Sequence, residues 1–256
     1  KTMALTKTIN NEKNEIVWSI SPEVVRLYAY SCFWVLVIVG AFLTFNFADV
    51  DFQDNPLINM FGYNNICILF DSFPATYFLP MLWSVNFLLL FSYITLSWYR
   101  VYQMYLFDNY PKSNFTIFST FSIFEYIGLI FFSGVFAANP HHEGMFLHTI
   151  PFTFLIFALS LMGIKNYLFY RYIARLSNFE KNLGLLYVIV HLGVSFIKMT
   201  MQLNALFGDV FYTTLNFIAL NQFIDRFWMA TAVLFPIYFS LKFRKRVPSI
   251  EFKSSF

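Results

Sequence analysis

The sequence is poor in charged residues, cysteine, glycine and proline. Charged residues make up 12% of its 256 residues, whereas an ordinary soluble domain carries about 25%. So few charges cannot cover the surface of a water-soluble protein of this size. The formal net charge is only +3, with 9 Gly and 9 Pro. This composition excludes a disordered chain, a collagen and a basic nucleic-acid-binding protein, so no nucleic-acid partner is expected.

The sequence also lacks the motifs that are typical of cofactor-binding sites and of enzyme active sites. Its only cysteines are Cys32 and Cys67. We place Cys32 inside a membrane span and Cys67 outside one, so a disulfide framework is excluded, and the sequence contains no CxxC zinc motif. It contains no Gly-rich phosphate loop, no GxSxG and no HExxH. Its first twenty residues do not read as a cleavable signal peptide. The sequence therefore identifies no cofactor and leaves open whether any reaction is catalysed.

Apolar residues dominate instead. They make up 58% of the chain, aromatic residues make up 22%, and the mean hydropathy is +0.58. A membrane-crossing helix needs about 20 mostly apolar residues, and six stretches qualify: 25–47, 75–98, 115–137, 147–170, 183–203 and 213–240. We therefore predict an all-α fold, a polytopic bundle of six transmembrane helices in a single domain, 1–256. Residues 48–74 are expected to form a long outer loop.

The charges around these spans separate by sign. If there are six spans, fifteen basic residues fall on one side of the membrane: Lys1, Lys7, Lys13, Arg26, Arg100, Lys112, Lys165, Arg171, Arg175, Lys181, Lys242, Arg244, Lys245, Arg246 and Lys253. The opposite side carries only acidic residues: Asp49, Asp51, Asp54, Asp71, Glu143 and Asp209. The positive-inside rule then places both termini on the cytoplasmic or equivalent inner side. The sequon at Asn114 is expected to stay unmodified.

Five ionisable residues fall at membrane depth, where they usually face the bundle interior. Glu125 lies in the third predicted span, His191 and Lys198 in the fifth, and Asp225 and Arg226 in the sixth. We predict a polar layer that joins these three spans. A structural interpretation pairs Asp225 or Glu125 with Arg226, Lys198 or His191. A functional interpretation makes the layer a lipid-headgroup or ion site, an acid–base pair or a proton path.

A second polar cluster lies at the outer end of the third and fourth spans. It contains His141, His142, Glu143 and, one turn into the fourth span, His148. Three histidines and a glutamate could bind zinc, but His142 and His148 do not share a helix face and match no zinc motif, so no metal site is predicted. The alternatives are a hydrogen-bonded cap or a polar mouth that contacts a lipid headgroup.

Three segments carry a family resemblance. Residues 124–129 (FEYIGL) place an acid inside a helix, residues 142–146 read HEGMF, and residues 223–243 form an aromatic final helix. Together they resemble the six-helix superfamily of post-GPI-attachment lipid-remodelling factors and damage-regulated autophagy modulators; His148 could match the second branch. The resemblance implies both ends inside, a long first outer loop, and a lipid-handling or lipid-sensing role in secretory or endolysosomal membranes.

Three functions remain open at this point. The first is a lipid-associated protein in which Glu125, His142, Glu143, His148, His191, Lys198, Asp225 and Arg226 contact membrane lipids, with a bound phospholipid expected. The second is a structural accessory subunit of a large membrane complex, for example a respiratory one in the mitochondrial inner membrane. The third is a transporter or channel lined by the same polar layer.

Overall fold

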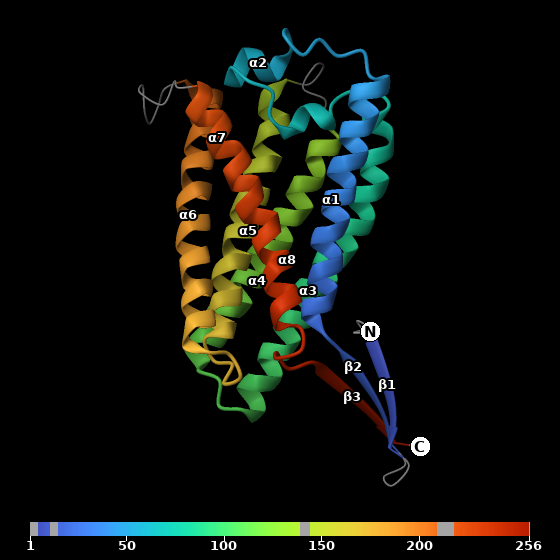
Figure 1. Cartoon of the computed structure of the whole chain (residues 1–256), viewed down its shortest axis with the longest axis vertical. Helices are drawn as coiled ribbons and strands as arrows, with labels where there is room; N and C mark the ends of the chain where they lie inside the picture. Colours follow the sequence, from blue (N-terminus) through green and yellow to red (C-terminus); the bar gives the residue numbers. More distant parts are fainter. Residues whose placement is uncertain (1–4, 11–14, 139–143, 209–217, 256) are drawn as a thin grey trace.

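The chain folds as a bundle of long helices with a small sheet at one end. The computed structural model describes residues 5–10, 15–138, 144–208 and 218–255. Within these residues, five helices are long and apolar enough to cross a membrane, as a multi-pass membrane protein requires. They are α1 (Pro22–Phe47), α3 (Ala75–Phe107), α4 (Lys112–Phe132, continued by a 3₁₀ turn, Ser133–Phe136), α5 (Met145–Tyr170) and α6 (Asn178–Phe207), and they run side by side (Figure 1).

The sixth predicted span, 213–240, corresponds to a helical segment with a change of pitch. It consists of α7 (Ile218–Met229), a π-helical turn (Ala230–Leu234) and α8 (Phe235–Phe243), which pack against α6 and α1 respectively. Pro236 explains the change, because it has no N–H for the carbonyl four residues earlier and its ring crowds that carbonyl. Residues 213–217 lie outside the described part of the chain. A membrane crossing by this segment stays a prediction.

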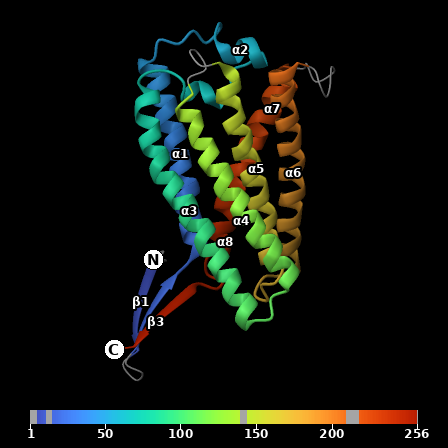
Figure 2. The same ribbon diagram turned by 180° about the vertical axis from the view of Figure 1, so that it is seen from behind.

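A three-stranded sheet was not predicted. Strands β1 (Leu5–Asn10), β2 (Glu15–Ile20) and β3 (Ile250–Ser255) pair antiparallel in the order β1-β2-β3, with Ile20 opposite both Leu5 and Ile250. The sheet lies at the end of the bundle that holds both termini, here called the termini end (Figures 1 and 2). The sheet forms because β2 pairs with β1, its neighbour in the sequence, and also gains a partner strand, β3, from the opposite end of the sequence.

The predicted outer loop, 48–74, has structure of its own at the opposite end of the bundle, here called the far end. It contains α2 (Pro56–Phe61) and a 3₁₀ helix, η1 (Ile66–Leu69). The Asn55 side chain accepts hydrogen bonds from the first turn of α2, and the Asn65 side chain accepts one from Cys67. Asparagine is a favoured residue at this capping position.

Helix lengths and packing also differ from the sequence-based expectation. Helix α3 continues nine residues beyond the predicted end at Trp98, to Phe107, because a helix does not have to end where its apolar stretch ends. Helix α5 is the most buried of the five long helices. It contacts α4 closely, since a Cβ atom added at Gly128 would lie 2.6 Å from the Ala158 Cβ. Many large apolar side chains outside these contacts are exposed, as expected for a surface that faces lipid.

Candidate functional site

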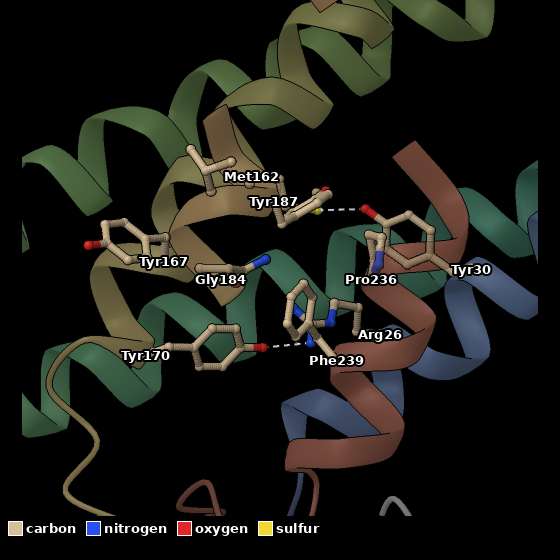
Figure 3. Close-up of a pocket in the computed structure, with 12 residues that line it drawn as sticks. Arg26, Tyr30, Met162, Tyr167, Tyr170, Gly184, Tyr187, Pro236 and Phe239 are labelled. Carbon is tan, nitrogen blue, oxygen red and sulfur yellow. Dashed lines mark hydrogen bonds between the residues drawn. The ribbon is translucent and has the colours of Figure 1, made fainter. Parts of the chain in front are cut away.

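A buried ion network at the termini end joins four helices. The Glu23 carboxylate lies 2.6 Å from the Arg26 guanidinium and 3.0 Å from that of Arg100. The Tyr170 hydroxyl donates to Glu23 at 2.9 Å and accepts from Arg26 at 2.6 Å, and Arg26 also donates to Ser240. Figure 3 shows the hydrogen bond between Arg26 and Tyr170, which both line a small cavity. The network therefore holds α1, α3, α5 and α8 together.

Sequence reasoning missed this network. It counted Arg26 and Arg100 only among the basic residues on the inner side of the membrane. The side chains of Glu23, Arg26 and Arg100 are all buried. The available signal was the i, i+3 spacing of Glu23 and Arg26, which allows an ion pair on one helix face. Serine is a favoured residue at a helix N-terminus, but the Ser21 side chain at the start of α1 makes no capping hydrogen bond.

Glu125 is buried, but its partner is not the one predicted. Its carboxylate pairs with Lys165 of α5, and the same ammonium donates to Ser122 at 3.0 Å. Neither Lys198, Arg226 nor His191 pairs with it among the described residues. The prediction of a single layer through the third, fifth and sixth spans is therefore wrong for Glu125. Lys165 was misassigned because it precedes the predicted span end by only five residues.

The other members of the predicted layer lie between α6 and the α7–α8 segment. Lys198 forms an ion pair with Asp225. His191 is buried, and its Nδ1 lies 3.1 Å from the Thr231 hydroxyl in the π-helical turn. These contacts join the fifth and sixth predicted spans in the way that the structural interpretation of the layer expected. Whether these residues also bind a ligand remains a prediction.

His148 at the far end is buried beside a residue that the sequence did not single out for this cluster. Its Nδ1 lies 3.0 Å from the Ala138 carbonyl oxygen, and its Nε2 lies 3.6 Å from the Asp71 carboxylate. Burial raises the pKa of Asp71 well above its ordinary value. His142 and Glu143 lie outside the described residues. Within the described part, no group of three possible metal ligands occurs.

A cavity of about 480 Å³ lies on the flank of the bundle at the far end, between α1, the predicted outer loop and α7. We call it the lateral cavity; its lining residues are Phe45, Phe52, Asn64, Asn65, Ile66, Ile68, Leu69, Gln222, Asp225, Arg226 and Met229. The rings of Phe45 and Phe52 stack with their centroids 5.4 Å apart. The cavity thus combines an apolar, aromatic wall with a polar wall on α7.

The polar wall contains one charge without a partner. Asp225 is neutralised by Lys198, whereas the exposed Arg226 side chain makes no ion pair or hydrogen bond among the described residues. Arg226 lies about 12 Å along the helix axis from Ile218, the first residue of α7, given 1.5 Å per residue. The lining contains no Ser, Thr, Cys, Lys, His or Tyr, and its one carboxylate, Asp225, is paired with Lys198. The arrangement suits binding of an anion that carries an apolar chain.

A smaller apolar cavity of about 20 Å³ lies in the interior beside it, and Met229 lines both. Its only amide-bearing side chain is Asn86, which is fully buried with neither amide atom hydrogen-bonded within the described structure. A cavity of this size holds about one water molecule. Asn86 was not among the sequence candidates, because a single uncharged polar residue inside an apolar stretch is a weak signal.

No protein-family model, curated protein or solved structure matches the chain.

Proposed function

We propose that this chain is a multi-pass membrane protein that binds a phospholipid in the lateral cavity. The observation that carries the proposal is the unpaired guanidinium of Arg226 on the wall of a cavity whose opposite wall is aromatic. A cation at membrane depth is unfavourable unless it is paired or reaches water. A lipid phosphate supplies the missing anion, and the apolar wall accommodates the start of an acyl chain.

The size and position of the cavity support the same proposal. Small-molecule sites typically measure about 300–1,000 Å³ and combine apolar walls with a few polar groups, and the lateral cavity fits this description at about 480 Å³. It lies between helices on the flank, where a lipid can enter sideways. The far end would then face the outer side of a secretory or endolysosomal membrane, as the family resemblance and the charge distribution imply.

The proposal is tested by native mass spectrometry of the full chain extracted in a mild detergent. We expect the wild type to retain an anionic phospholipid and Arg226→Gln to bind it about tenfold more weakly, because a hydrogen bond to a charged group contributes about 1.5–3 kcal/mol. The matched control is Arg171→Gln, an exposed arginine at the termini end that does not line the cavity. Equal lipid retention by Arg226→Gln and wild type would contradict the proposal.

The aromatic wall is tested separately. The double variant Phe45→Ala with Phe52→Ala removes the stacked pair and is expected to weaken retention of a long-chain lipid more than retention of a short-chain analogue with the same headgroup. Lost apolar contact explains this difference, since burial contributes about 25 cal/mol per Å². Equal losses for both lipids would place the bound chain elsewhere.

A structural accessory subunit is the second candidate. Large apolar side chains such as Phe42 and Phe47 lie exposed on α1 near the lateral cavity, and large exposed apolar surfaces mark contacts with protein as well as with lipid. The same spectra distinguish the two functions. A polypeptide partner present at fixed stoichiometry in place of a lipid would favour the accessory role.

A further inference from the structure

A second and larger cavity, of about 790 Å³, lies at the termini end. Its lining residues come mainly from three connections: the turn between α3 and α4, the loop between α5 and α6, and the segment that follows α8; Ser19 of β2 and Glu251 of β3 also line it. The three connections lie at the termini end of the bundle (Figure 2). We call this hollow the basic cavity, and its charged lining residues are Asp108, Arg175, Arg244, Lys245, Arg246 and Glu251. It lies at the opposite end of the bundle from the lateral cavity and is independent of the proposed function.

The basic cavity has a well-packed floor. Tyr110, Ile173 and Val247 line it and are buried in a hydrophobic cluster at the termini end. The rings of Tyr110 and Tyr172 meet edge to face with centroids 4.9 Å apart. The backbone N–H of Val247 donates to the carbonyl of Phe243 at 3.0 Å, which closes the turn after α8. These contacts fix the three connections relative to one another, so the basic side chains are held around a formed cavity.

Most of the positive charge around this cavity is unpaired. Arg246 binds Glu180 at 2.5 Å, but the side chains of Arg175, Arg244 and Lys245 make no ion pair or hydrogen bond among the described residues. Arg100 lies behind the floor, where its guanidinium donates to the Pro248 carbonyl at 3.4 Å. Three free cations around one hollow repel each other, so an anion between them relieves that repulsion.

We propose that the basic cavity binds the phosphate group of an organic phosphate. Arginine matches a phosphate with two parallel hydrogen bonds, and lysine contacts it as a point charge. The carboxylates of Asp108 and Glu251, which also line the cavity, accept hydrogen bonds from hydroxyl groups of the same molecule. The cavity directly follows the last turns of α5 and α8, where lipid headgroups would lie. The phosphate can therefore belong to a lipid headgroup or to a free metabolite.

Two probes with the same phosphate chemistry distinguish these sources: dioleoyl phosphatidic acid in mixed micelles, and free glycerol 3-phosphate. Binding is measured by thermal shift and by titration of the full chain in detergent. We expect at least one probe to bind, with an affinity that falls as salt is raised, because exposed charges are screened. Binding of the lipid alone assigns the site to a headgroup, and binding of glycerol 3-phosphate assigns it to a free phosphate.

The triple variant Arg175→Gln, Arg244→Gln, Lys245→Gln should bind the active probe at least tenfold more weakly. The control Arg171→Gln, Lys181→Gln removes charge at the same end but not from the cavity lining and should bind like the wild type. If the triple variant does not fold, Arg175→Lys with Arg244→Lys keeps the charge and loses the paired donors, so a smaller loss is expected. Binding of neither probe by the wild type, or equal binding by the triple variant, would overturn the proposal.

Discussion

At the scale of single residues, Asn86 has more unpaired polar atoms than any other buried side chain in the part of the chain that the structure describes. Both of its amide atoms are buried without a hydrogen bond in the described structure, in a cavity otherwise lined by apolar and aromatic side chains. Leaving a buried polar group unpaired costs about 1–3 kcal/mol. The small cavity beside Asn86 has room for about one water molecule. The amide is therefore either unpaired or hydrogen-bonded to a water molecule in that cavity.

Replacing this residue measures which of the two it is. If the amide is unpaired, Asn86→Leu should raise the free energy of unfolding by about 1–3 kcal/mol, since leucine has a similar volume and no polar atoms to satisfy. Thermal unfolding of the purified protein in detergent gives the measurement. A loss of stability would show instead that a water molecule or ligand completes the hydrogen bonds of the amide.

Asp71 gives a pH dependence of known sign. Because burial raises its pKa, the folded state favours the protonated carboxyl. As the pH rises above the ordinary aspartate value, the unfolded chain ionises first, and Asp71 lowers the stability of the fold until its own raised pKa is passed. We expect the melting temperature to fall as the pH rises above the ordinary aspartate pKa, by a few degrees for each kcal/mol lost in a protein of this size.

The variant Asp71→Asn should reduce this pH dependence, because its amide does not titrate. An ion pair with His148, whose Nε2 lies 3.6 Å from the Asp71 carboxylate, would give a different pH dependence. In that case the His148 imidazole is protonated and pairs with an ionised Asp71, and the stability of the wild type would decrease at high pH only as His148 loses its proton. The variant Asp71→Asn would then be less stable than the wild type at pH 5.

At the scale of helices, α4 and α5 are joined by a buried ion pair and by close backbone contact. Glu125 and Lys165 are both fully buried. Removing one partner of such a pair leaves an uncompensated charge and costs about 3–5 kcal/mol, whereas replacing both can be neutral or stabilising. We expect Glu125→Gln and Lys165→Met each to lower the thermal stability strongly, and the double variant to recover most of the loss. Additive losses would show that the two side chains are not paired.

The close contact of these helices has its own test. A Cβ atom at position 128 would lie 2.6 Å from Ala158 and 2.9 Å from the Phe154 carbonyl oxygen. Gly128→Ala should therefore force the helices apart and cost about 1–3 kcal/mol. Gly193 in α6 is the matched control, because an added Cβ there meets nothing within 4 Å. Gly193→Ala should be neutral or stabilising, by up to about 1 kcal/mol from helix propensity.

At the scale of the whole molecule, the bundle has two different ends. The termini end carries the sheet, the buried network of Glu23, Arg26 and Arg100, and the basic cavity. The far end carries α2, the Asp71–His148 pair and the lateral cavity. The placement of the termini end on the inner side, which the basic segments favour, stays a prediction. The orientation determines from which side of the membrane a ligand reaches each of the two proposed binding sites.

Glycan mapping tests that orientation directly. Expressed in a glycosylating cell, the chain should carry no glycan at Asn114, which lies at the start of α4 at the termini end. The variant Asp51→Asn with Gln53→Thr creates a sequon on exposed residues of the far-end loop and should become glycosylated. Mobility before and after enzymatic deglycosylation reports both sites. A glycan at Asn114, with none at the engineered site, would reverse the proposed orientation.

The sequence by itself determined the helical, membrane-compatible class and the approximate positions of the long helices. It could do so because a run of apolar residues is a local property, and so is the excess of basic residues in particular loops. It also identified Glu125, His148, His191, Lys198 and Asp225 as buried or paired candidates, since charges inside apolar stretches must avoid lipid. His142 and Glu143 lie outside the described residues, so their role stays a prediction.

Only the tertiary structure decided which residues become partners. The pairs Glu125–Lys165 and Asp71–His148 join residues distant in sequence, and neither partner reveals the other through spacing. Strand β2 pairs with β3 across more than 200 residues, which local propensity cannot predict. The two cavities arise in the same way, because each is enclosed by segments that meet only after the helices have packed.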